Sequence, residues 1–226
     1  MQPYFFPYIG YFQLINAVNC FVVYDDVSYI KQGWINRNKI LINNKEHRIT
    51  LKVLKASSFK CINQIKVECN RNKLLKTIEQ AYKKAPYFGV VCSIIKEILL
   101  NDESNLAKFI EYSLYSIICY LDINTKIVIS SSLNKNNKLK SEEKVIDICT
   151  TLGADCYINS YNGQHLYSRC NFAEKGIELK FIKSIPAIYY KQFNNEFVAG
   201  LSIIDVMMFN SKEQISELLK LCTFST

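Results

Sequence analysis

The stretch MQPYFFPYIGYFQLINAVNCFVVYDDV, residues 1–27, decides the fold. Its apolar runs and helical spacing predict four elements in order: a short strand at 1–6, a turn through Pro7 and Gly10, a helix at 11–18 and a buried strand at 20–26. Strand, helix and strand alternate again in the second half of the chain. This order predicts an α/β fold whose mostly parallel sheet is flanked by helices.

The rest of the sequence adds an inserted β-hairpin and a helical stretch to this sheet. Alternating residues on either side of an Asn-Asn-Lys turn predict the hairpin, with strands at 39–43 and 47–53. Helical spacing predicts helices at 71–84, 87–100 and 104–121, so a helical subregion covers about 71–121. Further strands are predicted at 62–68, 125–130, 155–159 and 177–182, and further helices at 141–152, 169–175 and 211–221. Because no linker or repeat interrupts residues 1–226, we expect a single domain.

The composition narrows the class of protein. The 226 residues include nine cysteines, an odd number, and no Cys-x-x-Cys pair occurs. Reduced, packed thiols are therefore expected rather than disulfides or a metal site, which favours the cytoplasm. The sequence shows neither a signal peptide nor a membrane span. The net charge of +8 suits an anionic partner.

Two adjacent acids, Asp25 and Asp26, end the second predicted strand. Ligands of open α/β sheets bind outside the carboxyl ends of the strands, so both acids are candidates for chemistry. Successive side chains alternate across a strand, and only one of the two can face a given pocket. One acid could serve as general base or bind an amine or a sugar. The other would accept backbone hydrogen bonds or pair with a basic neighbour.

The segment YIKQGWINRNKI, residues 29–40, combines Lys31, the single Trp34, Asn36 and Arg37 on one predicted loop. An aromatic face stacks on a ring, and arginine binds phosphate or carboxylate with two parallel hydrogen bonds. The segment therefore suits a sugar or a nucleotide. Alternatively, Trp34 anchors the loop in the core and Arg37 pairs with an acid at the end of the second strand. The polar patch at 131–144 is predicted to be a surface loop that leads into a helix.

Two further segments carry polar candidates. His165 follows a strand that points at the ligand edge, where it could act as a general base or be a surface residue. Asp205 lies in the apolar run LSIIDVMMF and would need a partner if buried, such as Lys191, Arg37 or backbone amides. In the alternative interpretation, Ser202 caps a helix and Asp205 lies in its first turn.

Several of these segments together resemble the WbqC-like protein family. They are MQPYFFPYIGYFQLI, GWINRNKI, AYKKAPYF and YKQFNNEFVAGLSIIDVMMFN, and they cover nearly the whole chain in the same order. The positions that match the family motifs are Gln2, Pro3, Pro7, Gly10, Asp26, Trp34, Asn36, Arg37, Tyr82, Pro86, Tyr87, Gln192, Phe197, Ser202 and Asp205. The family pattern does not fix residue 165 as histidine, which weakens the case for His165.

The resemblance implies an enzyme of bacterial O-antigen or other surface polysaccharide biosynthesis. The implied activity is transfer of an amino acid such as glycine, or another acyl group, onto the amine of a nucleotide-linked amino sugar. ATP or an activated acyl donor would serve as co-substrate, and nucleic acid would enter only as an aminoacyl-tRNA donor. Under this hypothesis the catalytic candidates are Asp26, Asp25 and His165, and the substrate-binding candidates are Gln2, Tyr4, Gly10, Lys31, Trp34, Asn36, Arg37, Gln192 and Asp205. The alternative is a non-catalytic module that binds a nucleotide or nucleic acid.

Overall fold

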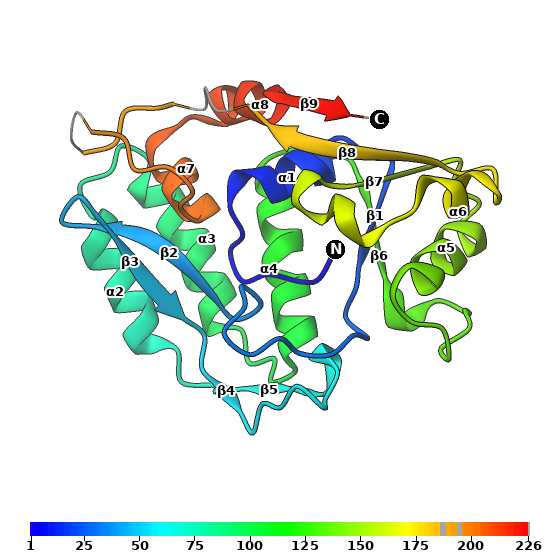
Figure 1. Ribbon diagram of the computed structural model, residues 1–226. Helices are drawn as coiled ribbons and strands as arrows, with labels where there is room; N and C mark the ends of the chain where they lie inside the picture. The colour runs from blue at the N-terminus through cyan, green and yellow to red at the C-terminus, as the bar shows by residue number, and fades with distance from the viewer. Residues whose placement is uncertain (186–188, 194–195, 226) are drawn as a thin grey trace.

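The computed structural model describes residues 1–185, 189–193 and 196–225 (Figure 1). Asn194 and Asn195, which belong to the segment YKQFNNEFVAGLSIIDVMMFN quoted above, lie outside the described residues. Helices and short strands alternate along the chain, and the predicted α/β class is confirmed.

Two pairs of parallel strands form the centre of the fold. Strand β1 (Cys20–Val23) pairs with β6 (Lys126–Ile129), and β7 (Cys156–Ser160) pairs with β8 (Glu178–Ser184). Strand β9 (Cys222–Ser225), which the sequence pattern did not reveal, adds to β8 in antiparallel orientation. Helix α1 (Ile9–Asn16) precedes β1 and lies near β7 and β8. The strand–helix–strand start predicted for this region is confirmed from the helix onward.

The predicted hairpin is present as β2 (Arg37–Ile42) and β3 (Lys45–Thr50). Its two turn residues, Asn43 and Asn44, have φ values of 49° and 62°. Two successive residues with positive φ match the right-handed twist of the strands they connect, and asparagine tolerates this conformation well. Beyond the hairpin, β4 (Val53–Leu54) pairs with β5 (Lys66–Val67) in antiparallel orientation.

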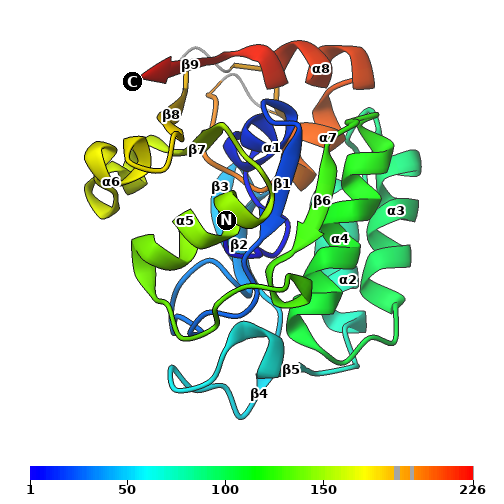
Figure 2. The same cartoon turned by 90° about the vertical axis from the view of Figure 1, so that its right-hand side faces the viewer.

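The helical subregion consists of α2 (Asn72–Tyr82), α3 (Phe88–Leu100) and α4 (Leu106–Tyr120), close to the predicted bounds. Figure 2 shows these helices on one side of β1 and β6, with α5 (Ser141–Thr151) and α6 (Arg169–Ala173) on the other. Helices α7 (Ile203–Phe209) and α8 (Lys212–Lys220) close the chain before β9. The main core therefore lies among α1, the strands and α4, and a smaller apolar cluster lies under α5 and α6.

Two predicted strands differ from the structure. Residues 1–6 are not a strand: Met1 bonds to β1, and Phe5 and Phe6 turn inward into the core with no exposed surface. The strand predicted at 62–68 is reduced to β5, because a 3₁₀ turn occupies Ile62–Gln64. Within the described part of the chain, no helix is long and apolar enough to cross a membrane.

Candidate functional site

Asp25 follows β1 and holds together two turns at the carboxyl edge of the parallel strands. Its Oδ1 accepts the backbone N–H of Ser131 at 2.9 Å, and its Oδ2 accepts Ser131 Oγ at 2.6 Å and Asn63 Nδ2 at 3.1 Å. Only 3% of the residue is exposed. Its neighbour Glu111 on α4 has a raised pKa, first because of burial and second because of the charge of Asp25. Both oxygens of Asp25 are thus committed to the fold.

Asp26 contacts two buried lysines. Its Oδ1 accepts Ser130 Oγ at 2.7 Å, while its Oδ2 lies 2.9 Å from Lys135 Nζ and 3.0 Å from Lys144 Nζ. The lysine side chains are 0% and 8% exposed, and that of Asp26 is 14% exposed. Burial alone would raise the pKa of Asp26, but the hydrogen bonds from Ser130 and the two ammonium groups outweigh it and lower the pKa. Asp26 is therefore ionised at neutral pH.

The two ammonium groups also bind main-chain oxygens. Lys144 Nζ donates to the carbonyl of Asp26 at 3.0 Å and lies 5.2 Å from the centre of the Tyr24 ring. Lys135 Nζ donates to the carbonyl of Ser130. We call Asp26, Ser130, Lys135 and Lys144 the Asp26 cluster. One carboxylate and two ammonium groups give this cluster a local excess of positive charge.

The sequence pattern did not reveal the two lysines of the Asp26 cluster. Lys135 lies in the segment 131–144, which was predicted to be a surface loop. That prediction is wrong for Lys135 and Lys144, whose side chains point inward. The one visible signal is that Lys144 shares the apolar face of α5 with Val145 and Ile148. A lysine at such a position needs an acidic partner.

An aromatic wall adjoins the Asp26 cluster. Tyr24 has a raised pKa because it is half-buried and because it lies near the negative charge of Asp26. Beyond it, Asn159 at the end of β7 donates from Nδ2 to the hydroxyls of Tyr157 at 3.0 Å and Tyr167 at 2.9 Å. The carboxyl edge of β1, β6 and β7 therefore presents fixed cations next to tyrosine rings and hydroxyls.

The opening turn also reaches this edge through Tyr8, which lies beside Ser160 at the end of β7. Gly10 is buried in the first turn of α1, where an added Cβ would lie 2.3 Å from the ring of Tyr8 and 2.8 Å from Ser184 Oγ. Close packing within the chain therefore requires this glycine. Tyr4 is half-buried, with its ring 5.6 Å from that of Tyr11.

Gln2 accepts a hydrogen bond at its backbone oxygen from the hydroxyl of Tyr11, at 2.9 Å. The Gln2 side chain is half-buried. The prediction that it binds substrate stays a prediction.

The segment 29–40 contains Trp34 and is called the tryptophan loop. Some of its side chains are exposed and others are buried. Trp34 is 45% exposed and Lys31 is also exposed, so both are open to a ligand. Asn36 is buried: it donates to the carbonyl of Leu51 at 2.8 Å and accepts the hydroxyl of Tyr29 at 2.8 Å. Trp34 therefore does not anchor the loop in the core, and Asn36 supports it from below.

Arg37 is half-buried at the start of β2, and its Nε is a buried donor without a hydrogen-bond acceptor among the described residues. The alternative pairing of Arg37 with Asp25 or Asp26 is wrong, since both acids bind the partners given above. Arg37 lies next to Tyr29, whose pKa is raised by burial and lowered in part by the guanidinium.

A second buried acid, Asp205, lies in the first turn of α7. Its oxygens accept the hydroxyl of Tyr82 at 2.8 Å, the hydroxyl of Tyr190 at 2.7 Å and Gln192 Nε2 at 2.7 Å. Burial raises its pKa, and these three donors partly oppose the shift. Ser202 caps α7 through the N–H of Ile204, so the capping interpretation is confirmed. The partners are thus neutral donors, and neither Lys191 nor Arg37 is among them.

The predicted site residues therefore fall into separate places. Figure 1 shows α7 and the hairpin on one side of α1, and α5, which carries Lys144, on the other. Asp205 and Gln192 belong to the first side and the Asp26 cluster to the second. His165 is exposed in the 3₁₀ turn Tyr161–Leu166 that follows β7. Whether these residues act on a substrate stays a prediction.

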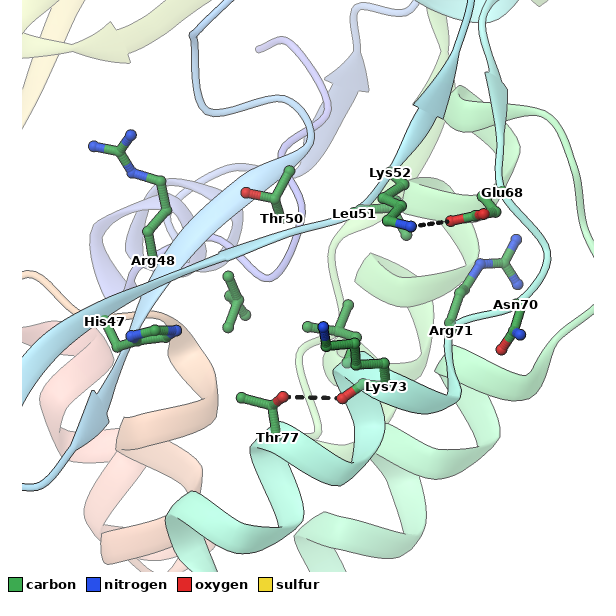
Figure 3. A pocket seen from close by; sticks show the side chains of 12 residues that line it. His47, Arg48, Thr50, Leu51, Lys52, Glu68, Asn70, Arg71, Lys73 and Thr77 are labelled. Carbon is green, nitrogen blue, oxygen red and sulfur yellow. Dashed lines mark hydrogen bonds and ion pairs between the residues drawn. The ribbon is translucent and has the colours of Figure 1, made fainter.

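A groove of about 250 Å³ lies between β3 and the start of α2 (Figure 3). Lys73 and Thr77 of α2 line one wall, and His47 of β3 lines the other. At one end, Lys52 pairs with Glu68 at 3.2 Å. The groove is partly basic and lies apart from the carboxyl edge of the parallel strands.

Comparison with known proteins identifies the family. The model of the WbqC-like protein family matches residues 2–217, which is almost the whole chain. The chain belongs to the WbqC-like protein family. A relative named "Uncharacterized protein Rv1507c", from Mycobacterium tuberculosis (strain ATCC 25618 / H37Rv), is 25% identical over 226 residues, or 98% of this chain and 96% of the relative. No solved structure matches the chain with significant similarity.

Proposed function

We propose that this WbqC-like protein transfers an aminoacyl or other acyl group, with glycine as the first candidate, onto the amine of a nucleotide-linked amino sugar. The product would enter the O-antigen or another surface polysaccharide of a bacterium. The Asp26 cluster carries the proposal, because it fixes a carboxylate and two cations where α/β sheets bind ligands. The positive net charge suits a nucleotide diphosphate.

In this proposal Asp26 anchors the sugar amine. Its lowered pKa makes it a weak proton acceptor at neutral pH, since an efficient general base has a pKa near the working pH. An ionised, fixed carboxylate is instead well suited to orient an ammonium or amine by a charge-assisted hydrogen bond. The excess positive charge of Lys135 and Lys144 then favours the diphosphate and the oxyanion that forms when the amine attacks the acyl carbon.

The chemistry requires the amine nitrogen to bond to the acyl carbon, the donor's leaving group to depart with its electron pair, and the nitrogen to lose a proton. His165 stays the candidate acceptor of that proton, because it is exposed close to the end of β7. Asp25 is assigned to positioning Asp26, since both of its oxygens bind the turns around it. The donor is ATP with a free amino acid, or an activated acyl group on a carrier such as aminoacyl-tRNA.

Residues of the tryptophan loop and the opening turn would provide a second set of contacts to the same substrate, beyond those of the Asp26 cluster. Trp34 and Tyr4 would stack on rings, and Lys31 and Arg37 would bind the diphosphate. Arg37 Nε has no hydrogen-bond acceptor in the part of the chain that the structure describes, which supports a role for Arg37 as an anion ligand. Gln2, Gly10 and Asn36 would shape the walls, while Asp205 would hold Gln192, and through it Val198, against α7.

A thermal-shift screen tests the proposal. UDP- and dTDP-linked sugars that carry a free amine are compared with the same sugars after N-acetylation and with the nucleoside diphosphates alone. We expect a free-amine sugar to raise Tm more than its acetylated counterpart, and mass spectrometry should detect the acylated product when ATP and glycine are added. If free-amine and acetylated sugars gave equal shifts and no donor gave product, the transferase proposal would be rejected.

The alternative is a non-catalytic module that binds a nucleotide or nucleic acid, and the partly basic groove between β3 and α2 favours it. Such a module would lose affinity steeply between low and moderate salt on any nucleic-acid sequence. Replacing Lys73 in the groove by Ala should then weaken nucleic-acid binding and leave the thermal shift with nucleotide sugars unchanged. If a nucleic acid bound with this salt dependence and no sugar bound, the alternative would replace the transferase.

A further inference from the structure

A cavity of about 380 Å³ lies between β1 and β7, at the amino-terminal half of both strands. Its lining includes Asn19, Cys20 and Val22 on one side and Cys156 and Ile158 on the other. The Asp26 cluster lies at the opposite ends of the strands, and the proposed transferase chemistry does not use this cavity. Figure 2 shows that β1 and β7 run near each other without forming one sheet.

Among the described residues, neither strand has a partner strand on the edge that faces the cavity. In a parallel pair, alternate residues direct their N–H and C=O groups to the same neighbour. The N–H of Lys126 donates to Asn19, so the odd-numbered residues of β1 face β6 and Cys20 and Val22 face the other way. Likewise the N–H of Glu178 donates to Asp155, so Cys156 and Ile158 face away from β8. These outward residues are among those that line the cavity.

One residue already pairs with the free edge of β1. The nitrogen of Met1 donates to the carbonyl of Val22 at 2.9 Å, and the carbonyl of Met1 accepts the N–H of Tyr24 at 2.8 Å. This is the hydrogen-bond pattern of a parallel strand with Met1 opposite Val23. Residues added ahead of Met1 in the same register would lie opposite residues 19–22, at and just before the start of β1. These residues line the cavity.

We propose that this cavity is a strand-acceptor site, which takes an extended apolar peptide segment joined through the Met1 nitrogen and parallel to β1. About four residues, at about 3.3 Å each, would reach the amino end of β1. The segment would hydrogen-bond to β1 on one edge and to β7 on the other. The separate pairs β6–β1 and β7–β8 would then become one continuous sheet.

The cavity wall specifies the chemistry of this segment. Leu14 of α1 and Val18, which follows this helix, lie among its lining residues, as do Val145 and Ile148 of α5. A parallel strand that is covered by helices on both faces consists of consecutive apolar residues, often β-branched ones. The site therefore takes a run of valine or isoleucine and excludes charged side chains.

The state of the Met1 nitrogen agrees with this proposal. It is buried, and burial lowers the pKa of its ammonium to about 5. A buried charged amine is costly, whereas a peptide N–H at the same position would make the same hydrogen bond without a charge.

The test adds four residues ahead of Met1 in the full-length protein. One variant carries Val-Ile-Val-Ile, and the matched control carries Val-Pro-Val-Pro, whose prolines cannot donate to a strand ladder. We expect the apolar extension to raise Tm by about 5–10 °C over the control, given the apolar surface that it buries.

Alkylation of cysteines by a small reagent, mapped by mass spectrometry, supplies a second measurement. Cys20 and Cys156 line the cavity, and the exposed Cys69 and Cys170 serve as internal controls. Filling the cavity should slow alkylation of the first two by about tenfold and leave the controls unchanged. Equal Tm values for the two extensions, unaltered alkylation at Cys20 and Cys156, or an apolar variant that misfolds while the proline control folds would each overturn the proposal.

Discussion

Replacing Asp26 by Asn should strongly destabilise the fold, because it leaves two buried ammonium groups without their carboxylate. The side chains of Lys135 and Lys144 are 0% and 8% exposed, so water cannot replace the lost charge. Removing one partner of a buried ion pair costs about 3–5 kcal/mol. Both ammonium groups keep a main-chain carbonyl, so we expect the lower end, about 3 kcal/mol, which corresponds to a fall in Tm of about 6–12 °C for a chain of this size.

The assay is equilibrium urea unfolding followed by circular dichroism, with Asp122→Asn as the matched control. Asp122 also pairs with a lysine, Lys212, at 3.1 Å, but both side chains are solvent-exposed. Exposed pairs contribute about 0–1 kcal/mol, and asparagine tolerates the φ of 54° at this position. The control should therefore unfold at nearly the wild-type urea concentration.

A double variant tests the physical reason for the loss. Lys144→Met removes one of the two unpaired ammonium groups and keeps an apolar stem against the Tyr24 ring, so it should recover part of the stability lost in Asp26→Asn. The reasoning would be refuted if Asp26→Asn cost no more than Asp122→Asn, or if the double variant were less stable than Asp26→Asn alone.

The remaining predictions concern pH, binding and packing. The pKa of Asp26 is lower in the folded state than its ordinary value of 3.8, so its full contribution to stability is present above pH 3.8 and is lost as pH falls through the folded pKa. The Asp26→Asn variant should not show this loss of stability in urea titrations between about pH 2 and 5. Arg37→Ala should abolish the thermal shift with nucleotide sugars while the far-UV spectrum stays unchanged, and an undiminished shift would exclude its diphosphate role. Asp205→Asn should cost about 2–4 kcal/mol in the same urea assay, because its N–H₂ would replace an oxygen that accepts either Tyr82 or both Tyr190 and Gln192. Gly10→Ala should cost about 1–3 kcal/mol, because its Cβ would meet the Tyr8 ring at 2.3 Å, and unaltered unfolding would show that this turn can relax.

Elements governed by local sequence were predictable. The three helices between residues 72 and 120 follow from apolar residues at helical spacing and from the break at Pro86. The hairpin follows from alternation on either side of two asparagines that accept positive φ. In both cases the deciding contacts lie within a few residues of one another, so the pattern alone contains the information.

Elements governed by distant contacts were not predictable. Strand β9 exists because β8 offers a free edge, and its own four residues carry no strong strand signal. The sequence pattern of residues 1–6 predicts a strand. In the structure, Phe5 and Phe6 instead turn their side chains into the core, and Phe6 has a φ of 43°. Pairing with partners far along the chain decides these segments, and a single sequence does not display those partners.

The candidate site shows the same division. The position of Asp26 at the carboxyl end of a buried strand was predictable, and its role in a site stays a prediction. Its partners were not, since Ser130 and Lys144 lie 104 and 118 residues away. A lysine in a polar segment is normally solvated, and only the presence of an ionised carboxylate makes its burial tolerable.

The two acids that end β1 hold different parts of the fold together. Asp25 ties the turn after β6 to the turn at residues 62–64, and this fixes the direction of the chain that carries Asp26. Asp26 then holds Lys135 and Lys144 and also accepts the hydroxyl of Ser130, in the turn after β6. A carboxylate whose orientation is set by a neighbour's hydrogen bonds loses little entropy when it binds an amine, which is the requirement for an anchoring group. The order of the pair therefore determines which acid joins the two turns and which acid holds the two buried lysines.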